Sequence, residues 1–170
     1  MTPLFATLSI LSSLWPFHQE RQTKTERYAT PAWHIDITRD KFTNKIECRL
    51  YQGRRKHPLV SYSRSTLAFQ FKRKFNTTKA SFRVGSGPTV PWTSVYPQLV
   101  GLGATLSGKS LDNPSEGRVL IPAALFENDF VIAIRATPRS KPILFGVQGL
   151  ADSLVTARAQ GCDPETGFVA

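Results

Sequence analysis

Apolar and polar residues alternate with a period of two in several short segments of the chain. Trp33, Ile35 and Ile37 alternate with polar residues, and residues 46–51 repeat the pattern. Because successive side chains of a β-strand point to opposite faces, both segments are predicted to be half-buried strands. The polar residues 39–45 between them are typical of a turn, so a first hairpin is expected.

A second pair of strands is expected further along the chain. Residues 67–71 and 80–84 show the same alternation and are separated by the basic residues 73–79. We interpret them as a second hairpin. Residues 53–58 predict a basic turn, and the Gly- and Pro-rich residues 84–97 are compatible with a short edge strand.

The C-terminal third predicts two more strands, at residues 130–135 and 143–147, followed by the one convincing helix, at residues 150–160. Apolar positions recur there at helical spacing, and Gly161 is suited to end the helix. The predicted stripe is Leu150, Ala151, Leu154, Val155 and Arg158. The fold class is therefore mainly β: an antiparallel β-sandwich-like domain with one C-terminal amphipathic helix.

The chain divides into three parts. Residues 1–17 are apolar and uncharged and resemble the hydrophobic part of a secretory signal, although no basic residue precedes them and no Ala-x-Ala site follows. Residues 18–31 are polar and are interpreted as a linker. Residues 32–170 form a single β-rich domain. Export is the favoured interpretation of the first segment, with an uncleaved anchor and a frayed cytosolic tail as the alternatives.

Composition agrees with one folded domain. The chain has 170 residues, of which 41% are hydrophobic and only 20% charged, which is unlike a disordered chain. Its net charge of +10 is concentrated between residues 39 and 83. This segment contains thirteen Lys and Arg but only two acidic residues. Such a field attracts anionic partners, namely lipid headgroups, acidic glycans or nucleic acid, and the alternative is a merely soluble basic face.

Two basic clusters are the candidate binding residues. They would converge on one edge of the sheet if each were a turn at the end of neighbouring hairpins. The clusters are Arg54, Arg55 and Lys56, and Lys72, Arg73 and Lys74. Phe69, Phe71 and Phe75 lie among the second cluster, but their alternation favours the core over a platform for stacking bases.

The two cysteines, Cys48 and Cys162, show no metal-binding spacing. In an oxidising compartment they would pair, and closing so long a loop would stabilise the fold by roughly 4–5 kcal/mol. The alternative is two unrelated buried thiols in a cytosolic protein.

Catalytic and metal-binding motifs are not found in the sequence. His18, His34 and His57 lie in three different settings, and Gly85–Gly87 is too short to hold a phosphate. Asp36 and Asp152 have no evident acid–base partner. We therefore expect no enzyme activity, no cofactor and no metal site.

The layout resembles the invasion-associated locus B family of small exported alphaproteobacterial proteins, or an uncharacterised relative. The resemblance spans about residues 32–165. It consists of the strand at residues 33–36, Cys48 in the next strand, the two late strands, and a helix opened by Gly149-Leu150 that ends near Gly161-Cys162. The number of cysteines and the Gly/Pro-rich middle depart from the family. The resemblance implies a periplasmic β-sandwich-like fold and a non-enzymatic role at the cell envelope.

These observations predict a periplasmic or secreted, non-enzymatic protein. It would bind an anionic envelope component or an envelope protein through its basic face. The alternative is a cytosolic nucleic-acid-binding module that uses the same face.

Overall fold

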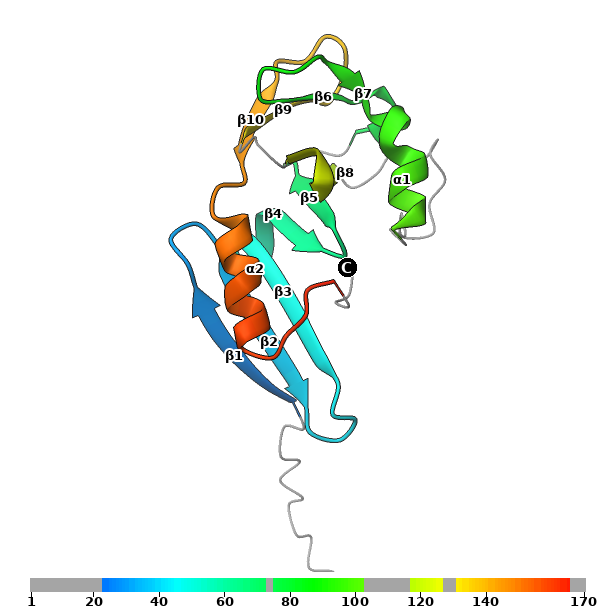
Figure 1. The fold of residues 1–170 in the computed structure, drawn as a ribbon. Helices are drawn as coiled ribbons and strands as arrows, with labels where there is room; N and C mark the ends of the chain where they lie inside the picture. The colour runs from blue at the N-terminus through cyan, green and yellow to red at the C-terminus, as the bar shows by residue number, and fades with distance from the viewer. Residues whose placement is uncertain (1–22, 73–74, 103–116, 127–130, 166–170) are drawn as a thin grey trace, which may run out of the picture.

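The computed structural model describes residues 23–72, 75–102, 117–126 and 131–165. The fold is mainly β, with two antiparallel sheets and a short C-terminal helix, as predicted (Figure 1). One sheet has six strands in the order β1-β2-β3-β4-β5-β8, and the other has four in the order β10-β9-β6-β7. The predicted signal segment, residues 1–17, lies outside the described residues.

The six-stranded sheet is a meander that is completed by a later strand. Its members are β1 (Thr23–Ala29), β2 (His34–Asp40), β3 (Ile46–Arg54), β4 (His57–Ser63), β5 (Thr66–Gln70) and β8 (Arg118–Pro122). The first predicted hairpin is confirmed as β2 and β3, which pair with Ile37 opposite Cys48 and Ile35 opposite Leu50.

Strand β1 corrects the interpretation of residues 18–31 as a linker. Seven residues of that segment pair with β2, from Thr23 opposite Asp40 to Ala29 opposite His34. The segment has no apolar alternation because β1 is an edge strand whose side chains are exposed or half-buried. Backbone pairing to β2, rather than burial of side chains, therefore makes it a strand.

The second predicted hairpin is wrong. Strand β5 pairs with β4 and β8, whereas β6 (Ser81–Val84) belongs to the other sheet. The hairpin partner of β5 is β4. Strands β3 and β4 extend into the predicted basic turn, residues 53–58, so that only Arg55 and Lys56 remain as the turn. Strands β4 and β5 are joined by Arg64 and Ser65, both with positive φ angles, in place of the Asn-Gly pair that marks such turns in a sequence.

The four-stranded sheet combines β6 with β7 (Val90–Pro91), β9 (Val131–Arg135) and β10 (Ile143–Gly146). It confirms the two late strands and the short edge strand. Four helical segments connect or follow strands: η1 (Thr77–Lys79), η2 (Trp92–Val95), α1 (Tyr96–Gly101) and η3 (Ala123–Phe126). Helix α1 was not predicted.

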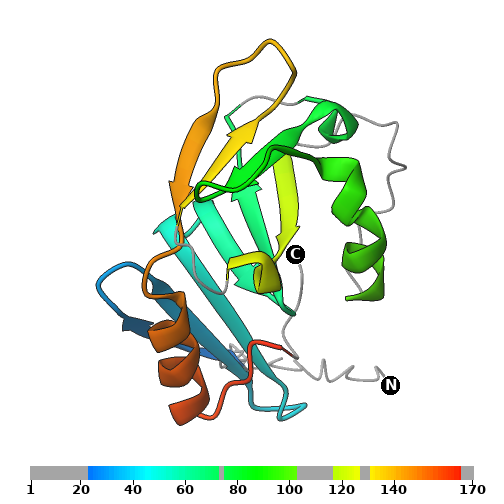
Figure 2. The ribbon, with the colours of Figure 1, turned by 45° about the horizontal axis from the view of Figure 1, so that its top comes forward.

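Helix α2 (Leu150–Ala159) and the four-stranded sheet cover the same face of the six-stranded sheet (Figures 1 and 2). Helix α2 lies over β1–β3, where the Thr30 hydroxyl is 2.8 Å from that of Ser153. The four-stranded sheet lies over β4, β5 and β8, where Phe69 contacts Phe145 with ring centroids 5.2 Å apart. We call this side the covered face and the opposite side the polar face.

The covered face carries the core. Ile35, Ile37, Leu50 and Phe69 are fully buried there, and each such side chain contributes about 1.5–3 kcal/mol through the hydrophobic effect. Phe71 is also buried and Phe75 packs against the core, as predicted. Of the described helices, none combines the length and the apolar composition that a membrane span requires.

Helix α2 has the predicted bounds within one residue but buries a different face. Ser153 and Ala157 are fully buried, whereas Val155 of the predicted stripe is 65% exposed. Small side chains let the helix approach the sheet closely, so burial follows the small residues rather than the large apolar ones. Leu150 and Leu154 pack only at the margin of the core.

The C-terminus of α2 confirms the role expected of Gly161. This residue has φ +73°, its N–H donates to the Arg158 carbonyl, and the N–H of Cys162 donates to the Ala157 carbonyl at 3.1 Å. These two bonds form a Schellman motif, which turns the chain sharply after the helix. The turn directs Cys162 towards β3.

Candidate functional site

Charged side chains form a row across β1, β2 and β3 on the polar face. Strand register places Arg27 opposite Asp36, and Asp36 opposite Arg49. Asp36 is only 4% exposed, although it carries a carboxylate. A buried carboxylate needs charged or hydrogen-bonding partners, and this row supplies them.

Asp36 is the centre of an ion-pair cluster. The guanidinium of Arg55 folds back from the β3–β4 turn and donates to Asp36 at 2.6 Å, and Arg27 lies 4.0 Å from the same carboxylate. The Tyr51 hydroxyl donates to it at 3.4 Å. Burial, followed by the nearby Asp36 charge, raises the pKa of Tyr51 above its ordinary value. No partner of Asp36 was evident from the sequence, because Arg55 is nineteen residues away along the chain.

The described residues of the two predicted basic clusters lie at one end of the six-stranded sheet. Arg54 ends β3, and Arg55 and Lys56 form the turn into β4. Strand β5 runs antiparallel to β4, with Phe69 opposite Val60, so Lys72 follows β5 at the same end. Arg73 and Lys74 lie outside the described residues.

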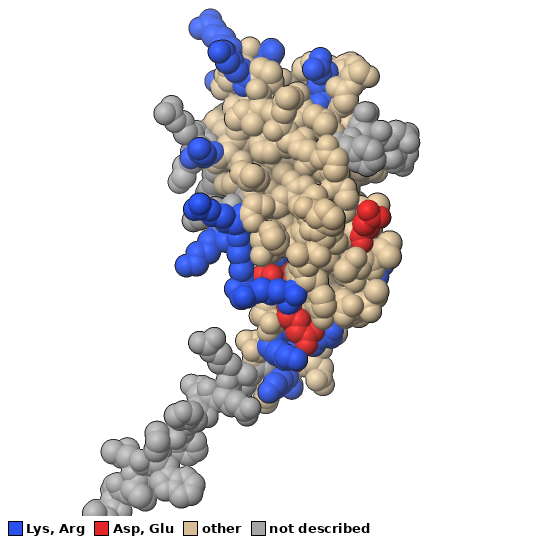
Figure 3. Space-filling model, turned by 90° about the vertical axis from the view of Figure 1, so that its left-hand side faces the viewer, with Lys and Arg blue, Asp and Glu red and all other residues tan. Residues whose placement is uncertain are grey.

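Two basic residues of this region were missed because each lies alone within a strand. They are Arg27 on β1 and Arg49 on β3. An isolated arginine has no cluster to mark it, although the period-two pattern does place Arg49 on the polar side of its strand. We define the basic band as the six exposed residues Arg27, Arg49, Arg54, Arg55, Lys56 and Lys72. Figure 3 shows Lys and Arg side chains along one side of the molecule, with acidic side chains next to the lower ones and further basic side chains at the top.

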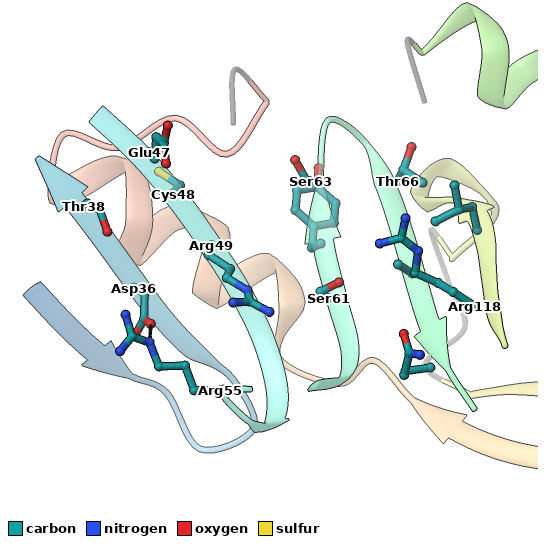
Figure 4. A pocket seen from close by; sticks show the side chains of 14 residues that line it. Asp36, Thr38, Glu47, Cys48, Arg49, Arg55, Ser61, Ser63, Thr66 and Arg118 are labelled. Carbon is teal, nitrogen blue, oxygen red and sulfur yellow. Dashed lines mark hydrogen bonds and ion pairs between the residues drawn. The ribbon is translucent and has the colours of Figure 1, made fainter. Parts of the chain in front are cut away.

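A hollow of about 420 Å³ adjoins the basic band on the polar face. Its polar lining comes from β2, β3, β4, β5 and β8 and includes Arg49, Ser61, Ser63, Thr66, Gln70 and Arg118. In Figure 4, Ser61 lies between the side chains of Arg49 and Arg118. Ala68 and Leu120 also line it but are themselves buried. We call this feature the polar hollow.

Two carboxylates line the polar hollow, and each has a basic partner of its own. Asp36 is paired with Arg55, and Glu47 lies 3.0 Å from the Lys45 ammonium group. The Arg49 guanidinium lies 5.5 Å from the centroid of the Tyr51 ring. Among the described residues no carboxylate forms an ion pair with Arg49, so its donors face the hollow.

The chain after α2 contacts the β4–β5 turn, at the opposite end of these strands from the β3–β4 turn. The Arg64 N–H donates to the Pro164 carbonyl at 3.2 Å, and the Ser65 hydroxyl donates to Glu165 at 2.7 Å. The Tyr62 hydroxyl also donates to Glu165. Burial, followed by this hydrogen bond, raises the pKa of Tyr62 far above its ordinary value. These bonds hold a turn whose two residues both have positive φ angles.

The predicted cysteine pair is brought together. Cys48 on β3 and Cys162 after α2 lie at disulfide distance, with Cα atoms 5.8 Å apart, which is within the ordinary range for a disulfide. The pair joins the helix end to the middle of the sheet. Cys48 lies directly beside the polar hollow.

Side chains of the types that bind metal ions do not gather in the described part of the chain. No group of three or more His, Cys, Asp or Glu side chains there could hold a metal ion. His34 is exposed and packs against Tyr51 with ring centroids 5.3 Å apart. His18 lies outside the described residues.

Comparison with family models, with curated proteins and with solved structures gives no significant match to this chain. The resemblance to the invasion-associated locus B family therefore stays a prediction. What the chain can do must be argued from the polar face: exposed guanidinium and ammonium groups next to a hydroxyl-lined hollow can bind an anion that also carries hydrogen-bonding groups.

Proposed function

We propose that this protein is exported and binds an anionic component of the cell envelope through the basic band. No catalytic role is proposed. The observation that carries the proposal is the convergence of six exposed basic residues, from strands β1 and β3, the β3–β4 turn and the segment after β5, on one part of the polar face. Asp36, the one buried carboxylate among the described residues, lies beside this band and is already paired with Arg55.

The arrangement favours a polyanion over a single small anion. The basic residues are spread along the end of the sheet and are exposed, so that each contributes a weak, screened attraction. Several such attractions acting together produce strong binding to a surface with many negative charges. Anionic lipid headgroups and acidic glycans both have that property.

Binding of single-stranded nucleic acid is less well supported. A stacking platform requires exposed aromatic rings beside the basic residues. Phe69 and Phe71 are buried, and Phe75 packs against the core. The nucleic-acid alternative is therefore an outcome that the experiment below can detect.

Export is supported by the cysteine pair. Disulfides persist outside the cytoplasm and are rare within it, so two cysteines at disulfide distance favour an oxidising compartment. The periplasm or the extracellular space is the proposed location.

The test is binding of the protein to anionic vesicles, to dextran sulfate and to duplex DNA across a range of salt concentrations. The Arg54→Gln, Lys56→Gln, Lys72→Gln variant removes three charges from the basic band without leaving Asp36 unpaired. We expect it to bind vesicles and dextran sulfate about tenfold more weakly and with a flatter salt dependence.

A matched control removes three exposed charges from the other sheet and its β9–β10 loop: Arg83→Gln, Arg135→Gln, Arg139→Gln. It has the same net charge as the test variant and should bind nearly as the parent does. Equal losses of affinity in both variants would mean that only the net charge of the protein matters. Tighter binding to DNA than to vesicles and dextran sulfate would favour the nucleic-acid-binding alternative. Either result would contradict the proposal.

A further inference from the structure

We infer that the polar hollow binds a short acidic oligosaccharide, such as a chain of uronic acid residues. This inference rests on the proposed function, because it places the anionic envelope component on the same polar face and gives it a chemical class.

The floor of the hollow has the hydrogen-bonding character that a sugar requires. Ser61 and Ser63 of β4 lie beside Ala68 and Thr66 of β5, with the register Ser61 opposite Ala68 and Ser63 opposite Thr66. A hydroxyl donates one hydrogen bond and accepts two, so it can serve a sugar hydroxyl in addition to its protein partners. Gln70 adds an amide, which both donates and accepts.

Guanidinium groups on two sides of this floor suit carboxylates. Arg49 lies on the β3 side and Arg118 on the β8 side, with Ser61 between them (Figure 4). A guanidinium binds a carboxylate through two parallel hydrogen bonds, which fixes its orientation as well as its position. A chain of uronic acids presents carboxylates separated by hydroxyls, which matches this alternation of charged and hydroxyl side chains.

Other occupants fit the hollow less well. The apolar side chains that line it, Ala68 and Leu120, are buried, so neither offers a lipid acyl chain much surface. Its one aromatic lining residue, Tyr62, is buried and bonded to Glu165, so a nucleobase would find no free ring to stack on. A volume of about 420 Å³ exceeds the needs of a lone inorganic anion and lies within the range of small-molecule sites.

The test is calorimetric titration of the full protein with a short oligogalacturonate, with the same oligosaccharide fully methyl-esterified, and with sodium sulfate at matched ionic strength. We expect the acidic form to bind and the ester to bind at least about tenfold more weakly, because the ester has lost the charge that Arg49 recognises. Equal binding of acid and ester would overturn the inference, as would full displacement of the oligosaccharide by sulfate.

Arg49→Gln should weaken oligogalacturonate binding about tenfold, and Ser61→Leu, which fills the floor, should do the same. Arg139→Gln, an equal charge change on the β9–β10 loop, should leave it unchanged. Arg49 is exposed, so its variant is expected to fold even where Ser61→Leu does not. Unchanged binding by Arg49→Gln would overturn the inference.

Failure here is distinguishable from failure of the proposed function. If vesicles and dextran sulfate bind through the basic band while oligogalacturonate does not bind, the inference fails and the proposed function stands. If none of the three binds, both fail.

Discussion

At the scale of single residues, the polar face depends most on Asp36. This carboxylate is buried between Arg27, Arg49 and Arg55, and it is the acceptor that holds the Arg55 side chain across the end of the sheet. A buried charge whose partner is removed is costly, so Asp36 and Arg55 depend on each other. Asp36 thus positions one member of the basic band without itself attracting an anion.

Asp36→Asn should lower the free energy of unfolding by roughly 1–3 kcal/mol, because a charge-assisted hydrogen bond to Arg55 becomes a weaker neutral one. Urea unfolding followed by tryptophan fluorescence measures this. Asp152→Asn is the control, since Asp152 is exposed in the first turn of α2 and should cost less. Equal losses in the two variants would mean that the ion-pair cluster adds nothing to stability.

At the scale of secondary-structure elements, α2 shows that small residues can decide which face of a helix is buried. Ala157 and Ser153 are fully buried one turn apart, while the larger Val155 faces solvent. Ser153 also bonds the Gly149 carbonyl at 2.7 Å and contacts Thr30, so its hydroxyl is satisfied at the interface. Close approach of helix and sheet then brings the helix end within reach of Cys48.

Ala157→Leu should destabilise the protein by roughly 1–3 kcal/mol, because added methylenes have no space between α2 and the sheet. Val155→Leu, which adds volume to the exposed side of the same helix, should change stability by less than about 0.5 kcal/mol. Thermal or urea unfolding of both variants measures the difference. A larger loss for Val155→Leu would mean that the helix packs through the stripe expected from its large apolar residues.

At the scale of the whole molecule, the cysteine pair connects parts of the chain that are 114 residues apart. It joins the middle of the six-stranded sheet to the end of α2. The segment after Cys162 then reaches the β4–β5 turn, where Glu165 accepts hydrogen bonds from Tyr62 and Ser65. The C-terminal segment is thereby attached to the six-stranded sheet at two places, at β3 and at the β4–β5 turn.

The double variant Cys48→Ser, Cys162→Ser should lower the free energy of unfolding by roughly 3–5 kcal/mol, because the unfolded chain regains the entropy of a long open loop. Unfolding in urea with and without a reducing agent measures this. The parent should lose a similar amount when reduced, and the double variant should not respond to reductant. A parent insensitive to reductant would mean that the cysteines are not bonded.

The sequence by itself determined the fold class, the first hairpin, the late strands, the end of α2 and the place of Cys48 on the apolar side of its strand. Each of these depends on local chemistry, namely period-two alternation around Ile35, a glycine at 161, or a cysteine on an apolar strand face. Arg27 of the basic band had no local sign, and for Arg49 the alternation of residues 46–51 indicated only the polar side of its strand.

Only the tertiary structure decided which strands pair, which face of α2 is buried and where the polar hollow lies. Strand β1 can be polar because it is an edge strand. In the β4–β5 turn, Arg64 and Ser65 have positive φ angles, and hydrogen bonds to the C-terminal segment support that turn. Asp36 meets Arg55, and Arg49, Ser61 and Arg118 line one hollow, only because of how the strands pair. Such contacts depend on long-range pairing, which no short window of sequence encodes.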